Sequence, residues 1–315
     1  MTWNVENLYR PGGRYGPIRT EAYDRKLAAL AAVIEDVGPD LVALQEVGDP
    51  EAVADLTGRL DGSWHTVLSQ RPDPRGIRVG FLSRLPVEPV ADTADLPGTV
   101  APVPAGDDGA VTTRAGRGAL AVRVRPGDAE VTAVTCHLKS KLLAFPAGPG
   151  GTRFVARDEA ERARYAAYAL YRRAAEAAGV RALVDDLLAG RGRTRPVVVL
   201  GDLNDGTQAA TTQVLHGPPG AETGTPAASR PDRNGDGWRL WNLSDLIPEP
   251  QRWSRVYRGR REQLDHILVS HALREQVGRV GTVGAPDLAS VRDDPHLRRQ
   301  AAAPDHAPVV AELAV

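Results

Sequence analysis

Runs of apolar residues at regular spacing divide the chain into predicted helices and strands. Leu27, Leu30 and Ile34 recur at helical spacing, which predicts an amphipathic helix over 21–37 that ends at Gly38-Pro39. Further helices are predicted over 50–60, over 155–189 with a bend at Gly179, and over 207–215. Apolar runs predict strands over 40–46, 77–83, 118–125, 130–138, 196–203, 264–270 and 307–315.

The remaining segments are rich in turn-forming residues. Residues 85–109 and 217–237 are polar stretches with many Pro and Gly residues, and both are predicted to be loops. Strands interspersed with helices and hairpins are typical of a mixed α/β sheet system. Because neither an internal repeat nor a linker is evident, we expect one domain over residues 1–315.

Polar residues stand at the ends of several predicted strands. The apolar run 196–203 leads into Asp202 and Asn204, which are two positions apart and would share one face of an extended chain. A carboxylate beside an amide suits a hard cation, or the positioning of a water molecule and a phosphoryl oxygen. The alternative is a polar turn, because Asp and Asn are favoured turn residues. The same design recurs along the chain, at Asn4, Glu46, His137, Asp265 and the pair Asp305-His306.

The recurrence matters more than any single position. A lone acidic residue at a strand end is usually a solvated turn residue. Carboxylates for a divalent cation, an imidazole as general base and cationic donors for an oxyanion together favour a metal-assisted hydrolase of phosphate esters.

Composition restricts the picture without deciding it. The 315 residues are 42% hydrophobic and 25% charged, with a formal net charge of −1, which describes a soluble globular protein without a global positive field. A local basic patch in one groove would still serve a nucleic-acid substrate. The single cysteine, Cys136, excludes an internal disulfide and is interpreted as a small core residue.

Lysine is used sparingly beside arginine. Apart from Lys26, the chain's lysines are Lys139 and Lys141, which follow His137 closely. On a strand these two would share the face of His137, so we interpret them as hydrogen-bond donors to a substrate phosphate. Lys139 is the stronger candidate of the two. The alternative is a solvated charged face.

Short motifs spread over nearly the whole chain carry a resemblance to a known family. In their order along the chain they look like those of the endonuclease/exonuclease/phosphatase superfamily, in particular the branch of deoxyribonuclease and the bacterial extracellular nucleases. The motifs are Trp3–Asn7, Gln45–Val47, Thr135–Lys141, Gly201–Asn204, Leu264–Leu268 and Asp305–Val309. The resemblance implies a four-layer α/β sandwich, in which two mixed sheets pack face to face with helices outside.

The resemblance also implies metal ligands. Glu46 resembles the main metal ligand of the family, with Asn4 and Asp305 near the same ion. The implied cofactor is Mg²⁺, with Mn²⁺ or Ca²⁺ as alternatives. Asp202 and Asn204 resemble the pair that orients or activates the attacking water and holds the scissile phosphate.

Proton chemistry is implied at two histidines. His306 resembles the histidine that acts as general base or stabilises the phosphorane-like state, and Asp265 resembles the carboxylate that orients it. His137 matches the histidine that contacts the phosphate or the leaving group in the deoxyribonuclease branch. His266 stands where many relatives carry tyrosine, and a packing role is as well supported as a catalytic one.

Two weaker patterns remain. Arginines that would line a substrate groove, or form solvated faces, are Arg153, Arg157, Arg162, Arg164, Arg252, Arg255, Arg258, Arg260 and Arg261. The segment Asp232, Asn234, Asp236 imitates the start of a Ca²⁺-binding loop, but its twelfth position is Leu243 and no helix pair flanks it. A polar turn is favoured there over a second, structural Ca²⁺.

The sequence therefore predicts a metal-dependent phosphodiesterase, most simply a nuclease acting on DNA, with RNA as the alternative substrate. The alternative is a phosphomonoesterase, or a phosphodiesterase for small molecules or phospholipids, of the same superfamily. No signal peptide or membrane-spanning run is evident, so we expect a cytoplasmic protein, or a secreted one if a leader was removed. A monomer without a membrane partner is favoured, although no residue pattern bears on oligomeric state.

Overall fold

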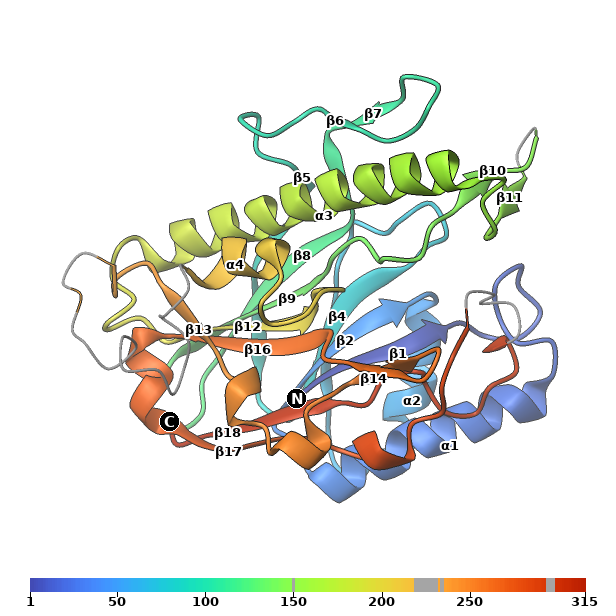
Figure 1. The fold of residues 1–315 in the computed structure, drawn as a ribbon. Coiled ribbons are helices and arrows are strands. Elements are labelled where there is room, and N and C mark those ends of the chain that lie inside the picture. The colour runs from blue at the N-terminus through green and yellow to red at the C-terminus, as the bar shows by residue number, and fades with distance from the viewer. Residues whose placement is uncertain (149–150, 218–231, 233–234, 293–297) are drawn as a thin grey trace.

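The computed structural model is a layered α/β protein, shown as a ribbon in Figure 1. It describes the chain except residues 149–150, 218–231, 233–234 and 293–297. Two 6-stranded sheets pack face to face, with helices on both outer sides. The predicted four-layer α/β sandwich is confirmed.

Each sheet combines strands from distant parts of the chain. Sheet A has the order β17-β18-β1-β2-β4-β3 and consists of β17 (Val277–Thr282), β18 (Val309–Leu313), β1 (Thr2–Leu8), β2 (Leu41–Val47), β4 (Arg78–Ser83) and β3 (His65–Leu68). Sheet B has the order β13-β16-β12-β9-β8-β5 and consists of β13 (Leu240–Asn242), β16 (Asp265–Ser270), β12 (Val197–Asp202), β9 (Val131–His137), β8 (Arg114–Val124) and β5 (Val87–Asp95). Small hairpins outside the sheets are β6 (Val103–Pro104) with β7 (Val111–Thr112), β10 (Phe145–Pro146) with β11 (Thr152–Arg153), and β14 (Arg255–Tyr257) with β15 (Arg260–Glu262).

Helices cover the outer face of each sheet because each helix presents one apolar stripe. The helices α1 (Thr20–Val37) and α2 (Pro50–Thr57) pack on sheet A, while α3 (Glu159–Leu188) and α4 (Ala210–His216) pack on sheet B (Figure 1). Gly38 ends α1 in the left-handed conformation, as its place after the apolar stripe predicts. The part of the chain that the structure describes holds no helix long and apolar enough to cross a membrane.

The space between the sheets is an aliphatic core. Val122, Val198 and Ile267 from sheet B meet Ala43, Phe81 and Val309 from sheet A in one buried cluster. Each Å² of apolar surface buried in this cluster contributes roughly 25 cal/mol, so its burial is the main force that holds the two sheets together. The core fills one end of the sandwich, and polar side chains replace it toward the other end.

Most predicted elements are confirmed, but strands β3, β13 and β17 were not predicted, and two predicted segments differ. The helix predicted over 155–189 begins at Glu159, capped by Asp158, and runs through Gly179 to Leu188. Residues 85–109 are not wholly a loop, because Val87–Asp95 form β5 at the edge of sheet B. The proline in β5, Pro89, is tolerated at this edge, where the pairing with β8 shifts register. Because proline is unfavourable within strands, Pro89 argues against a strand here when only the sequence is considered.

Gly201 allows β12 and β9 to approach closely just before Asp202. A Cβ atom at Gly201 would lie 2.1 Å from the Cys136 carbonyl oxygen. We therefore expect Gly201→Ala to lower the free energy of unfolding by about 1–3 kcal/mol, measured by chemical denaturation. Gly98→Ala is the matched control, because a Cβ atom there would meet nothing within 4 Å. Equal stability of the two variants would contradict this account of the strand contact.

Candidate active site

The predicted strand-end residues converge on one cleft of about 670 Å³ at the polar end of the sandwich. The parallel strands β1 and β2 of sheet A end there, as do the parallel strands β9 and β12 of sheet B. The antiparallel strand β16 begins there instead. Of the predicted site residues, the cleft is lined by Asn4, Glu46, His137, Lys141, Asp202, Asn204, Asp305 and His306.

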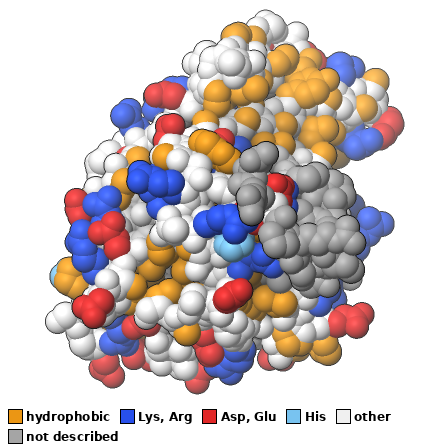
Figure 2. Space-filling model, turned by 90° about the vertical axis from the view of Figure 1, so that its left-hand side faces the viewer, with side chains coloured by type: hydrophobic (Ala, Val, Ile, Leu, Met, Phe, Trp, Pro, Cys, Tyr) orange, Lys and Arg blue, Asp and Glu red, His pale blue; other side chains and the backbone are white. Residues whose placement is uncertain are grey.

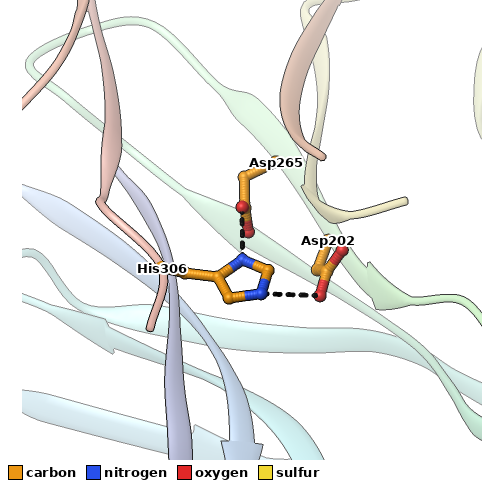
Figure 3. Close-up of side chains that lie close together, drawn as sticks. All are labelled: Asp202, Asp265 and His306. Atoms are coloured by element: carbon orange, nitrogen blue, oxygen red, sulfur yellow. Dashed lines mark hydrogen bonds and ion pairs between the residues drawn. The ribbon is translucent and has the colours of Figure 1, made fainter. Parts of the chain in front are cut away.

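His306 lies between two carboxylates of sheet B (Figure 3). Its Nδ1 is 2.6 Å from Asp265 Oδ2, and its Nε2 is 4.0 Å from Asp202 Oδ2. All three side chains are buried. Since Nδ1 is bonded to Asp265, the nitrogen that faces the cleft and Asp202 is Nε2.

Burial and charge pull the pKa values of this group away from their usual ranges. Burial alone would lower the pKa of His306, but attraction to Asp265 and Asp202 outweighs it and raises the pKa to about 10. Burial, together with repulsion from Asp265, raises the pKa of Asp202 to about 7. In the protein without a bound cation, His306 therefore carries its proton at neutral pH, and Asp202 stands near the point where it can accept one.

Glu46 reaches the cleft because the backbone of β2 is irregular. Its φ is +65°, and the pairing of β2 with β4 shifts register between Leu44 and Val47. Such a bulge re-aims a side chain that strand alternation would send to the opposite face. Glu46 Oε2 accepts from the Asn7 backbone N–H at 2.9 Å, and its Oε1 lies 3.4 Å from Asn4 Nδ2.

Asn4 connects the two sheets across the floor of the cleft. Its Nδ2 donates to Asp202 Oδ2 at 3.0 Å, and its Oδ1 accepts from the Glu6 backbone N–H at 3.0 Å. The amide thus fixes Asp202 of sheet B against Glu46 of sheet A. The Glu46 carboxylate offers oxygens that suit a hard divalent cation, whereas Asn4 presents its Nδ2 to the cleft, so its role as a metal ligand stays a prediction.

Asp305 is held by an arginine that sequence reading assigned only to a general cluster. Arg255 Nε and a terminal nitrogen both lie 3.2 Å from Asp305 Oδ2. Despite its burial, attraction to His306 and Arg255 lowers the pKa of Asp305. Asp305 lines the same cleft as Glu46, and its role as a metal ligand stays a prediction.

His137 and Asn204 complete the wall formed by sheet B. His137 Nε2 lies 3.3 Å from Asp202 Oδ2, and burial together with the nearby Arg117 charge lowers its pKa well below the usual value. His137 is therefore neutral, which suits contact with a phosphate or leaving group through a hydrogen bond. Asn204 has a φ of +53°, and its Nδ2 donates to the Leu138 carbonyl at 2.9 Å.

The two lysines after His137 do not share a face. Strand β9 ends at His137, so strand alternation does not extend to Lys139 or Lys141. Lys139 Nζ donates to the carbonyls of Ser140 and Leu142, whereas Lys141 lines the cleft and pairs with Asp205 at 3.3 Å and Glu262 at 3.2 Å. Burial lowers the pKa of Lys139 to about 7. In this conformation Lys141, rather than Lys139, lines the cleft.

The remaining candidates divide between the cleft and the rest of the molecule. His266 is buried away from the cleft, its ring bonded to Ser244 and to the Asp205 carbonyl, which is the packing alternative. Arg162, Arg255 and Arg258 line the cleft, whereas Arg153 and Arg157 pair with Glu161, and Arg164 pairs with Asp107. Arg252 donates to the Ile247 carbonyl, and Arg261 stacks on Trp253.

The Ca²⁺-like segment is balanced by arginines where it is described. Asp232 pairs with Arg239 at 3.1 Å, and the buried Asp236 pairs with Arg193 at 2.5 Å. Asn234 lies outside the described residues. Carboxylates neutralised in this way behave as a folded turn, so the pairing disfavours a second Ca²⁺ there.

Several cleft residues had no signal in the sequence. Arg75, Arg117 and Arg298 line the cleft from distant segments. Arg298 pairs with Glu6, at 2.6 Å from its Nε to Oε1, and the buried Lys26 of α1 donates to the Glu6 carbonyl. Isolated arginines outside any motif resemble ordinary surface charge, and only the tertiary fold brings them to the cleft.

Solved structures of other proteins share this fold. No curated protein matches the sequence. Among solved structures, truncated TDP2 of Caenorhabditis elegans has a TM-score of 0.54 at 16% identity, covering 99% of this chain and 95% of that chain. An endonuclease/exonuclease/phosphatase family protein from Bacteroides thetaiotaomicron has a TM-score of 0.54 at 14% identity, covering 99% of this chain and 95% of its own. ANGEL2, a 2′,3′-cyclic phosphatase in complex with adenosine-2′,3′-vanadate, has a TM-score of 0.54 at 12% identity, covering 100% of this chain and 95% of its own.

At these identities the solved structures establish the fold alone. A model of one family, described as the Endonuclease/Exonuclease/phosphatase family, matches residues 1–295. The chain therefore belongs to the Endonuclease/Exonuclease/phosphatase family.

Proposed function

We propose that the protein is a divalent-metal-dependent phosphodiesterase, most simply a nuclease that hydrolyses DNA, with RNA as the alternative substrate. The observation that carries the proposal is the His306–Asp265 pair. Its His306 Nε2 faces Asp202 in a cleft that Glu46 also lines. Members of the family are metal-dependent hydrolases of phosphoric esters.

The residues fit a cation on the side of sheet A. Glu46 would hold it together with Asp305, which lines the same cleft, and Asn4, whose amide would turn its oxygen to the ion, since carboxylate and amide oxygens are the ligands that Mg²⁺ and Mn²⁺ prefer. A bound ion would offset negative charge on a phosphate oxygen and so favour attack by water. The pairing of Asp265 with His306 Nδ1 argues against the cluster Asp202, Asp265 and His306 as the metal centre, although its ligand atoms lie within 4.8 Å of one another.

The chain's own groups then divide the work. Asp202 orients the attacking water and accepts its proton, because its carboxylate lines the cleft opposite His306 Nε2. His306 carries a proton on Nε2 toward the charge that develops on the phosphate, and Asp265 holds its ring in place. Neutral His137 and the amide of Asn204 contact the phosphate or the leaving group.

Charge in the cleft supports a polyanionic substrate. On the face shown in Figure 2, basic and acidic side chains are interspersed, as expected for a net charge of −1. Basic residues from several segments nevertheless line the cleft, namely Arg75, Arg117, Lys141, Arg162, Arg255, Arg258, Arg292 and Arg298. Several of them are already paired with acids, so phosphate contacts would replace or share these ion pairs.

Apolar residues that line the cleft support a second candidate function. Leu142, Leu143, Phe154 and Val155 line the cleft beside the polar floor. An apolar wall suits the base of a nucleotide, and it equally suits the apolar part of a small phosphate ester or phospholipid. This apolar lining therefore supports a phosphomonoesterase or small-molecule phosphodiesterase as the second candidate.

One experiment separates the two candidates. The purified protein is incubated with plasmid DNA, single-stranded DNA and RNA in Mg²⁺, and the release of acid-soluble nucleotides is measured before and after EDTA is added. We expect release that stops on metal removal and returns with Mg²⁺ or Mn²⁺. Parallel assays use p-nitrophenyl phosphate and phospholipid vesicles. Hydrolysis of these substrates without cleavage of any nucleic acid would overturn the nuclease proposal and favour the alternative.

A further inference from the structure

A buried polar layer separates the aliphatic core from the floor of the cleft. It consists of Thr2 of β1, Gln45 of β2 and Thr135 of β9, and all three side chains have no measurable exposure. In β2 and β9 the residues two positions earlier, Ala43 and Ala133, belong to the aliphatic core. Two positions later, Thr2 is followed by Asn4 and Thr135 by His137, which line the cleft.

Gln45 connects the two sheets within this layer. Its Nε2 donates to Thr135 Oγ1 of sheet B at 3.0 Å, and to Thr2 Oγ1 of sheet A at 3.1 Å. The Thr2 hydroxyl in turn lies 3.3 Å from Gln45 Oε1. One carboxamide therefore ties a strand of one sheet to a strand of the other.

The side chains of Thr2, Gln45 and Thr135 are polar although they are fully buried. Burying an amide and two hydroxyls is unfavourable unless they bond to one another, and aliphatic side chains of similar volume would fill the space without that risk. Hydrogen bonds differ from aliphatic contacts in fixing the distance and direction between the strands they join. The strands joined here lead directly into both halves of the site.

The halves have different tasks in the proposed function. On sheet A, Gln45 immediately precedes Glu46. On sheet B, Thr135 precedes His137, and β9 is paired with β12 so that His137 lies opposite Asp202. Asn4 bridges the same two sheets one layer nearer to solvent, through Asp202.

We propose that Gln45 is a positioning residue that, through Thr135, sets the separation between the cation side of the cleft at Glu46 and the phosphate side at His137 and Asp202. This inference rests on the proposed function of the cleft. Groups that hydrogen-bond to the direct ligands of a site commonly change metal affinity or activity by about 10–100-fold when they are lost, and we take the lower end of this range for Gln45, which acts one residue further away.

The test compares Gln45→Met, Thr135→Val and the double variant, each of which removes the bond while keeping side-chain volume. Thr135→Ser keeps the hydroxyl, and Thr132→Val makes the same change on the opposite, outer face of β9 as a control. The readouts are kcat and KM for bis(p-nitrophenyl) phosphate, and the Kd for Mn²⁺ from isothermal titration calorimetry. Thermal unfolding is followed for every variant.

We expect both single variants to lower kcat and to weaken Mn²⁺ binding by about 10-fold or more, with the double variant no worse than the single ones. Thr135→Ser and Thr132→Val should stay near the parent protein. If kcat and the Mn²⁺ Kd stay within about twofold while only the melting temperature falls, Gln45 is a packing residue and the inference is overturned. If Gln45→Met fails to fold, Thr135→Val decides. If the parent protein hydrolyses no phosphate ester, the proposed function fails, and Mn²⁺ affinity alone still tests the positioning role.

Discussion

Replacing His306 by glutamine is expected to lower kcat for phosphodiester hydrolysis by about 10²–10⁴-fold, the usual contribution of a positioned acid–base group. Glutamine retains a donor toward Asp265, so the buried carboxylate keeps a partner, but its amide cannot carry a proton to the substrate near neutral pH. The loss should appear mainly in kcat rather than KM, because the imidazole acts on charge that develops in the transition state.

The measurement is the initial rate of bis(p-nitrophenyl) phosphate hydrolysis in Mg²⁺ or Mn²⁺, with circular dichroism to confirm folding. His65→Gln is the matched control, since His65 is an exposed residue of β3. A His306→Gln variant that keeps near-full turnover would refute the assignment of His306, whatever its stability.

Replacing Glu46 by glutamine should weaken binding of Mg²⁺ or Mn²⁺ by about 100-fold or more, because loss of an outer partner alone costs about 10–100-fold. The amide keeps the size of the side chain and removes the negative charge that faces the cleft. At limiting metal the variant should be nearly inactive, and activity should recover in part as the metal concentration rises.

The weaker metal binding of Glu46→Gln is checked by measuring activity as a function of Mg²⁺ or Mn²⁺ concentration. Glu21→Gln, which removes the charge of an exposed residue in the first turn of α1, serves as the control. If Glu46→Gln needs no more metal than the parent protein, Glu46 does not hold the ion. The metal would then have to be sought elsewhere in the cleft.

The fold could be predicted largely because the apolar patterns are strong. The stripe of α1 and the aliphatic run of β12 are long enough to show their period. Strand β5 was not predicted because Pro89 and acidic residues interrupt its apolar pattern. Proline is tolerated there because β5 lies at the edge of sheet B. The short hairpins outside the sheets depend on tertiary contacts that no local pattern records.

The site was predictable where polar residues end strands that meet at one edge of the sandwich. Glu46 and Asn204 reach the cleft through left-handed backbone conformations, which alternation along a strand does not predict. Lys139 shows the opposite outcome: β9 ends at His137, and the lysine side chain bonds to nearby carbonyls instead of facing the cleft.

The distant arginines of the cleft mark the limit of sequence reasoning. Arg75 and Arg298 reach it only through the packing of loops, and Arg255 pairs with Asp305 from the β14–β15 hairpin. Charge in such positions carries no periodic signal. Its function depends on which acid or phosphate the fold places opposite each guanidinium.

The central claim is a division of labour, with the cation on the side of Glu46 and proton chemistry at His306. The most direct test is calorimetric titration of Mn²⁺ into the parent protein, Glu46→Gln and His306→Gln. The account predicts that Glu46→Gln loses most of its Mn²⁺ affinity while His306→Gln binds Mn²⁺ nearly as tightly as the parent. Lost affinity in His306→Gln with normal affinity in Glu46→Gln would contradict it and place the ion between Asp202, Asp265 and His306 instead.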